Sequence, residues 1–284
     1  HRDIVLDSGL LDMVLFADKG FNTVEIAIGD NLLIRPWIKK LVRLNRSFIV
    51  QRSASIREML ASSKRLSSYI HYTITERNQP IWIAQREGRA KDSNDRTQES
   101  VLKMLAMGGE GTPAERLKHL HITPLTISYE YDPCDYLKAM EFQQKRDNPS
   151  FKKSKQDDLD NMKTGIWGKK GHIHYQTAPC INEWIDSLAH LPKAEFFTAV
   201  AQRMDREIHK GYMLFPGNYV ALDLLQGNTA HQSHYSAAEK ERFEKYIQER
   251  IDMIPLPNKD VPFLREKLLA MYANPVINKE KAVG

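Results

Sequence analysis

The sequence predicts an α/β fold in which a mixed or mostly parallel central sheet is flanked by helices on both faces and followed by a helical C-terminal tail. Two observations support this prediction. In roughly the first 130 residues, short apolar runs rich in branched side chains alternate with longer stretches of helical periodicity. From about residue 131 helical patterns dominate. We therefore expect one large domain, with its core in residues 1–130, which residues 131–284 continue and extend by a helical region.

Composition limits the class of protein. The 284 residues are 42% hydrophobic and 27% charged, as in ordinary globular proteins. No apolar run approaches the roughly 20 residues that a membrane-spanning helix needs. Lys and Arg exceed Asp and Glu by 41 to 36, which favours an anionic partner but does not choose among nucleic acid, anionic lipid and a phosphorylated substrate. Cys134 and Cys180 lie far apart and lack metal-ligand spacing, so we expect a reducing cytoplasm and no metal site.

The first elements follow from local patterns. An approximate stripe of leucine and valine predicts a short amphipathic helix over about 7–18, with Asp3 or Asp7 as its cap. Alternating branched residues predict a strand at 23–28, which turn residues end. The basic stretch 32–44 is an amphipathic helix. It suits an anionic membrane surface, with its tryptophan at the interface, or equally a solvated basic face above a core contact.

Three further strands complete the predicted sheet. Residues 47–50 form a short branched run, and 81–84 form a compact apolar run typical of a buried parallel strand. A long helix over 56–77 connects them, and a shorter one over 98–107 follows the second. The run 122–129 reads as another core strand, with a proline near its beginning.

The second half of the chain is mostly helical in pattern. One strand is expected at 172–175, after a glycine-flanked turn. The charged segment 149–160 lacks the offsets of a calcium-binding loop. Helices are expected at about 136–146, 182–188, 195–208, 219–225, 237–253 and 261–274.

A histidine at the start of the chain has carboxylates nearby. His1 is followed by Asp3 and Asp7. An acid that holds one imidazole nitrogen leaves the other free to take a proton, so this group is a minimal general-base pair. A helix cap is the competing role for Asp7, and the two roles are compatible.

Charged residues follow two of the predicted strands. Arg52 comes after 47–50, and Glu87-Gly88-Arg89 comes after 81–84. Ligands gather at the carboxyl ends of strands in open α/β sheets. At such a strand end, an arginine guanidinium can bind a phosphate or carboxylate. A glycine lets the backbone approach a substrate, and a glutamate can accept a hydrogen bond from a hydroxyl. The alternative is a polar loop that only closes a turn.

These blocks, in this order, resemble the glycerolipid acyltransferase family, which includes glycerol-3-phosphate and 1-acylglycerol-3-phosphate acyltransferases. The resemblance covers roughly residues 1–130. It rests on four stretches: His1 to Asp7, Phe48-Ile49-Val50-Gln51-Arg52, Glu87-Gly88-Arg89, and the proline-containing strand Ile122 to Ile127. In the family four residues separate the histidine from its aspartate. Here five separate His1 from Asp7, and Asp3 is nearer.

The resemblance implies a function and roles for these residues. His1 would be the general base of an O-acyltransferase in membrane lipid synthesis, with Asp7 or Asp3 orienting it. Arg52 and Arg89 would contact the phosphate or carboxylate of the acceptor, while Glu87, beside Gly88, would help to place its hydroxyl. The donor would be acyl carrier protein or a coenzyme A thioester, used as co-substrate, with no bound cofactor, metal or nucleic acid. The acceptor would be glycerol phosphate or lysophosphatidate.

Several alternatives stay open at this stage. A lyso-amino-acid lipid fits the same arginines as lysophosphatidate does. A basic nucleic-acid-binding module and an inactive membrane-surface scaffold also agree with the composition. For the enzyme we expect a cytoplasmic location, peripheral to the inner face of the membrane. We also expect a segment before His1 to be missing, because a catalytic histidine is normally positioned by the chain that precedes it.

Overall fold

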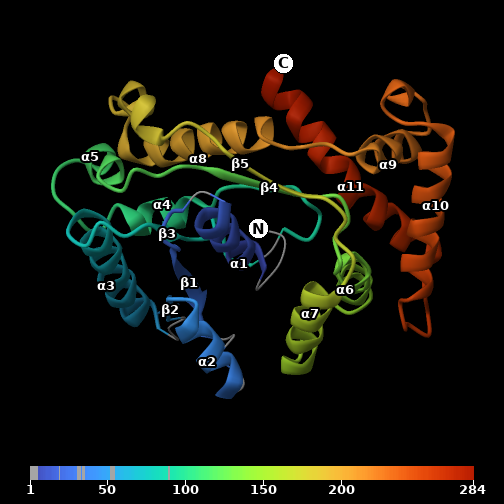
Figure 1. Ribbon diagram of the computed structural model, residues 1–284, viewed down its shortest axis with the longest axis horizontal. Helices are drawn as coiled ribbons and strands as arrows, with labels where there is room; N and C mark the ends of the chain where they lie inside the picture. Colours follow the sequence, from blue (N-terminus) through green and yellow to red (C-terminus); the bar gives the residue numbers. More distant parts are fainter. Residues whose placement is uncertain (1–5, 19, 31–32, 34–35, 52–54, 89) are drawn as a thin grey trace.

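A computed structural model describes residues 6–18, 20–30, 33, 36–51, 55–88 and 90–284 (Figure 1). Three short strands form a parallel sheet: β1 (Glu25–Gly29), β2 (Ser47–Val50) and β3 (Ile81–Trp82). Their order is β2-β1-β3. Helix α2 (Pro36–Leu44) lies between β1 and β2 in the chain, and α3 (Ile56–Thr75) lies between β2 and β3, as parallel neighbours require.

The fourth predicted core strand belongs to a different sheet. Strand β4 (Leu125–Tyr129) pairs antiparallel with β5 (Ile173–Thr177), and Ile127 lies opposite Tyr175. The prediction of one central sheet covered by helices on both faces is therefore wrong. Helix makes up 59% of the structure and strand only 8%, and the parallel sheet is small.

The reason lies in the side chains of β4. Ile127 and Tyr129 occupy one face, whereas Thr126 and Ser128 occupy the other and bind main-chain atoms: Thr126 Oγ1 donates to the carbonyl of Ile208, and Ser128 Oγ accepts from an amide. Such alternation is typical of a two-faced antiparallel strand rather than of a buried parallel one.

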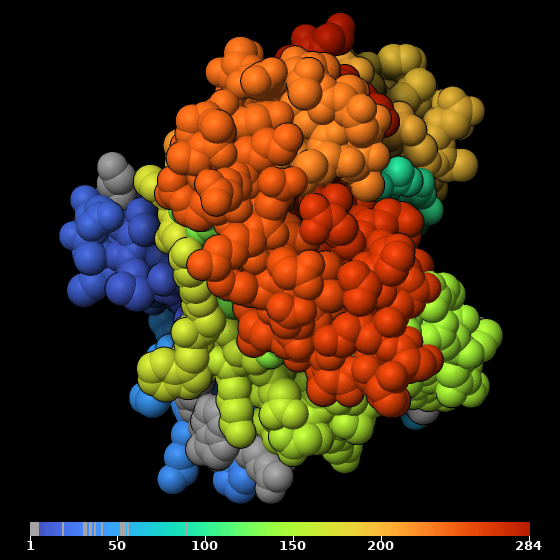
Figure 2. Space-filling model, turned by 90° about the vertical axis from the view of Figure 1, so that its right-hand side faces the viewer, coloured from blue at the N-terminus to red at the C-terminus, as the bar shows by residue number. Residues whose placement is uncertain are grey.

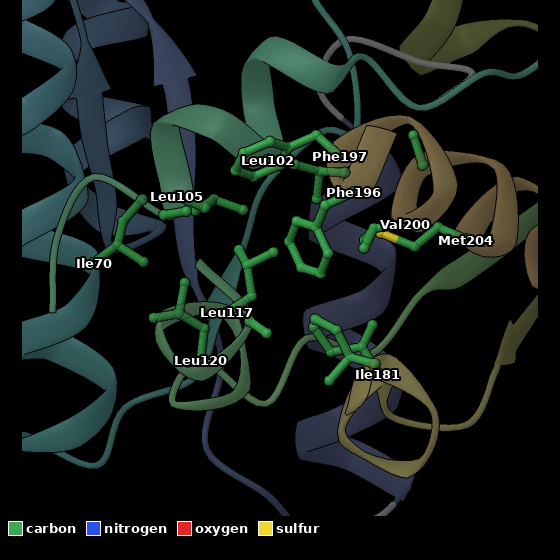
Figure 3. Close-up of a cluster of buried hydrophobic side chains, with 14 residues drawn as sticks. Ile70, Leu102, Leu105, Leu117, Leu120, Ile181, Phe196, Phe197, Val200 and Met204 are labelled. Carbon is green, nitrogen blue, oxygen red and sulfur yellow. The ribbon is translucent and has the colours of Figure 1, made fainter. Parts of the chain in front are cut away.

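Helices build the first hydrophobic core around this framework. Buried side chains converge from α3, α4 (Glu99–Leu105), α5 (Pro113–Lys118) and α8 (Lys193–Lys210) (Figure 3). Leu102, Leu117 and Val200 are at most 1% exposed. Because α3 and α8 come from opposite halves of the sequence, this core crosses residue 130.

A second core lies in the C-terminal region, where the predicted helical tail is present. Helices α6 (Asp135–Asp147), α9 (Pro216–Gln226), α10 (Ala237–Asp252) and α11 (Val261–Val283) pack together at the right of Figure 1. Helix α11 continues past Pro275 to Val283, well beyond the expected end at 274. Residues 181–183 and 185–188 form 3-10 turns instead of the expected helix.

Two N-terminal helices differ in how they are supported. Helix α2 buries Ile38 and Val42 against Leu159 and Met162 of α7 (Lys155–Trp167), so part of its apolar face makes the predicted core contact. Helix α7 itself was not predicted, although Ser154 caps it through a capping box. Helix α1 (Leu6–Met13) runs into a π-helical turn at 14–18 and projects from the body, in dark blue in Figure 2.

Candidate functional site

Three of the seven predicted site residues lie in the described part of the chain: Asp7, Glu87 and Gly88. His1, Asp3, Arg52 and Arg89 lie outside the described residues. Because β2 and β3 are parallel strands of one sheet, their carboxyl ends lie at the same end of the sheet, as predicted. In the sequence, Arg52 follows the first of these strands, and Glu87 to Arg89 follow the second.

Asp7 lies near the start of α1 and is buried, with 1% exposure. The hydroxyl of Tyr129 donates to its Oδ1 at 3.0 Å, and the hydroxyl of Tyr175 donates to its main-chain carbonyl at 2.7 Å. Burying a carboxylate is costly unless hydrogen bonds replace those it made to water. The antiparallel strands β4 and β5 thus supply donors that hold Asp7, a role that was not predicted for them.

Glu87 and Gly88 lie in the loop 83–98 that follows β3, and both are exposed. The amide of Glu87 donates to Gln98 Oε1 at 2.9 Å, and the amide of Gln98 donates to the carbonyl of Gln85 at 2.9 Å. Gly88 has φ +71°, and a Cβ there would meet no atom within 4 Å. The glycine is therefore favoured by the left-handed backbone and leaves open space beside Glu87.

Residues from three C-terminal helices hold this loop in place. The amide and hydroxyl of Thr97 both donate to Asp205 Oδ1 of α8 at 2.6 Å. Asn274 of α11 donates to the carbonyl of Asp92 at 2.7 Å. The hydroxyl of Thr97, a residue type that often caps helices, binds α8 instead, and Gln98, the N-cap of α4, makes no side-chain capping bond. A contact over 108 residues overrides a local capping preference here.

The third helix, α6, contributes a cluster of opposite charges. Glu141 is 4% exposed at its side chain and pairs with Lys91 of the loop, with Lys145 at 3.0 Å and with Lys153 at 2.7 Å. Burial raises the pKa of Glu141, but the hydrogen bonds from Lys153, Lys91 and Lys145 outweigh burial and lower it to about 2. Burial lowers the pKa of Lys91, while its bond to Glu141 acts in the opposite direction.

An apolar cavity of about 510 Å³ lies beside β3 and reaches the start of the loop at Gln85. Strand β3 is an outer strand of the parallel sheet. Residues of both β3 and β4 line the cavity, which lies between these two strands. Apolar side chains of α3, α4 and α8 line it, and polar groups of Asp95, Thr97 and Tyr212 are also exposed to it. Its volume falls within the range of roughly 300–1,000 Å³ that small-molecule pockets occupy. The sequence marked these residues only as core.

A second, wider groove of about 620 Å³ also borders Tyr212. Lys210, Lys279 and His174 are among its lining residues, and none of the seven predicted site residues lines it. Within the described part of the chain, none of these seven residues lines the apolar cavity either, but Gln85, Asp95 and Thr97 of the loop 83–98, which carries Glu87 and Gly88, do.

Two further observations describe the site's surroundings. In the described part of the chain, no three His, Cys, Asp or Glu side chains come close enough together to hold a metal ion. Among the same residues, no helix has the length and apolarity needed to cross a bilayer.

Comparison with family models, with curated proteins and with solved structures finds no match for this chain.

Proposed function

We propose that the protein is an O-acyltransferase that moves a fatty acyl group from a thioester to the hydroxyl of a glycerol phosphate or lysophosphatidate. The observation that carries the proposal is the apolar cavity that ends beside the loop of Glu87 and Gly88. An acyl chain needs a long apolar space, and its carbonyl needs polar groups at one end. The cavity along β3 and the loop at Gln85 offer this combination.

The buried position of Asp7 supports its assignment as the acid that orients His1, in preference to Asp3. A carboxylate can fix an imidazole only if it is itself fixed, and Tyr129 and Tyr175 hold Asp7 from two paired strands. If Asp7 were exposed at the start of α1, its position would support only the role of a helix cap.

The proposed reaction is direct transfer. His1 takes the proton of the acceptor hydroxyl as its oxygen attacks the thioester carbonyl. The new C–O bond forms, the C–S bond breaks, and the thiol leaves with a proton. Arg52 and Arg89 bind the acceptor's anionic group, and Glu87 accepts a hydrogen bond from its hydroxyl. Neither cysteine is acylated in this scheme, and Cys134 is buried.

The proposed setting is the cytoplasmic face of a membrane, where lysolipid acceptors are found. The donor is acyl carrier protein or coenzyme A thioester, each a co-substrate. A lyso-amino-acid lipid is the alternative acceptor, because guanidinium groups bind carboxylates as well as phosphates.

The test is thiol release from fatty acyl-coenzyme A and from acyl carrier protein thioester, with a panel of lysophosphatidate, glycerol phosphate and a lyso-amino-acid lipid. We expect release that depends on one acceptor. His1→Ala should lower the rate by about 10²-fold or more, as expected for loss of a general base. Cys180→Ala is the matched control and should leave the rate unchanged.

Release that is independent of acceptor, or that survives His1→Ala, would contradict the proposal. Binding to DNA or RNA that weakens steeply with salt, without thioester cleavage, would favour the nucleic-acid alternative instead.

A further inference from the structure

The antiparallel pair of strands β4 and β5 directs two tyrosines of one face at the same residue. Ile127 lies opposite Tyr175 in the antiparallel register, and Tyr129 follows Ile127 by two positions. Side chains two residues apart share a face, so Tyr129 and Tyr175 are neighbours on it. Both contact Asp7: Tyr129 at the carboxylate and Tyr175 at the main-chain carbonyl.

The opposite face of this strand pair binds it to the rest of the molecule through β4. Thr126 Oγ1 donates to the carbonyl of Ile208 of α8 at 2.7 Å, and Ser128 Oγ accepts from the amide of Met213 at 3.1 Å. Tyr129 is 7% exposed. Its hydroxyl is therefore presented by a strand bound on the other side, rather than by a mobile surface segment.

We propose that Tyr129 is a positioning residue for acyl transfer and acts through Asp7. This inference rests on the proposed function, in which Asp7 orients His1. A carboxylate has about four lone-pair sites on two oxygens, so the bond from Tyr129 to Oδ1 is compatible with a further bond to an imidazole. Tyr175 fixes the main chain of Asp7, and Tyr129 fixes the direction of its side chain.

The physical reason for the effect is orientation. Catalytic groups must be held within a fraction of an ångström of their productive place, and small displacements lower the rate strongly. Without the Tyr129 hydroxyl, the Asp7 carboxylate loses the donor at Oδ1, and its orientation is less tightly constrained. The substrate-binding groups on the loop 83–98 are untouched by this change.

The test is Tyr129→Phe in the full chain, assayed for thiol release with the best acceptor. Hydrogen bonds to charged groups are worth about 1.5–3 kcal/mol, so we expect kcat to fall roughly 10- to 100-fold. KM for donor and acceptor should stay within about twofold, because the Tyr129 hydroxyl does not take part in binding either substrate in this proposal. A merely structural role would not separate kcat from KM in this way.

A double-mutant cycle identifies the route of the effect. In an Asp7→Asn background, Tyr129→Phe should cause no further loss from the residual rate, because residues that act as a unit are not additive. The matched control is Tyr235→Phe, which removes a comparable tyrosine-to-aspartate bond of 2.7 Å to Asp223 near α9 and should leave kcat unchanged.

The outcomes separate the two proposals. If the wild-type protein releases no thiol with any acceptor, the proposed function is wrong. An active wild-type protein whose kcat survives Tyr129→Phe, or in which the losses from Tyr129→Phe and Asp7→Asn multiply, overturns the inference alone. If Tyr129→Phe fails to fold, Tyr129→Met takes its place in the same cycle, because it also removes the hydroxyl that donates to Asp7, with the same expectation and the same contrary result.

Discussion

At the scale of single residues, the structure shows how this chain buries charge. Glu141 is almost fully enclosed, yet three lysines reach it from the loop 83–98, from α6 and from the segment before α7. A buried carboxylate is tolerated when charged donors surround it. Because Lys91 follows Glu87 by four residues, this cluster also holds the middle of the loop that carries the predicted site.

The low pKa of Glu141 predicts a pH dependence of stability. Its pKa falls from 4.5 in the unfolded chain to about 2 in the folded protein. The resulting stabilisation is fully present above pH 4.5 and is lost as the pH falls toward 2. We expect Glu141→Gln to lower the free energy of unfolding by about 2 kcal/mol at neutral pH. Urea unfolding should show the difference from wild type narrowing below pH 4.5.

A suitable control is Glu99→Gln. Glu99 pairs with Lys103 at 2.8 Å on the surface of α4, where an exposed ion pair contributes little to stability. Equal losses for the two variants, or a difference for Glu141→Gln that does not change with pH, would contradict this account.

At the scale of elements, the loop after β3 depends on helices that come much later in the chain. The short strand β3 gives it a starting point only, since the strand ends at Trp82. Its polar groups are satisfied by α8 and α11, and Asp205 accepts two bonds from Thr97. Burial raises the pKa of Asp205, and the bonds from Thr97 act against this rise.

Removing this anchor should loosen the loop. For Asp205→Ala we expect faster amide exchange across residues 85–98 and a loss of roughly 1–3 kcal/mol in unfolding free energy, since the amide of Thr97 loses its acceptor. Hydrogen exchange read by mass spectrometry measures the first and urea unfolding the second. Asp186→Ala, which removes an exposed pair with Lys118, should change neither. Unchanged exchange in Asp205→Ala would show that α8 does not order the loop.

At the scale of the whole molecule, several large apolar side chains of the N-terminal segment are exposed. Met13 is 65% exposed, Phe16 67% and Phe21 62%, all in or just after the projecting N-terminal helix. Large apolar side chains grouped on one projection are typical of a surface that contacts a protein or a membrane. For an enzyme with a lysolipid acceptor, we expect this projection to contact the bilayer.

Vesicle binding tests that expectation. Replacing Phe16 and Phe21 together by serine should weaken binding to phosphatidylglycerol vesicles by about tenfold or more, because each buried phenylalanine contributes on the order of 1.5 kcal/mol or more. Val283→Ser, at an equally exposed position at the far end of α11, should have no effect. Co-sedimentation measures both. Unchanged binding of the double variant would assign membrane contact to another surface.

Much of the local structure was predictable. Strands β1 and β2, the long helix α3 and several helices of the C-terminal half lie near their expected positions, because apolar periodicity and turn residues act over a few positions. The parallel course of β1, β2 and β3 was also correct. The helix α7 was missed, although Ser154 and Asp157 carry a capping-box signal, because its apolar positions are few.

The sequence by itself therefore determined the local elements and the order in which the chemically suggestive residues follow the strands. Only the tertiary structure decided that β4 joins β5 rather than the parallel sheet, that Tyr129 meets Asp7 across 122 residues, and that α8 and α11 hold the loop after β3. The physical reason is range. Propensity and periodicity report on neighbours along the chain, whereas strand partners and buried hydrogen bonds depend on which distant faces are buried together.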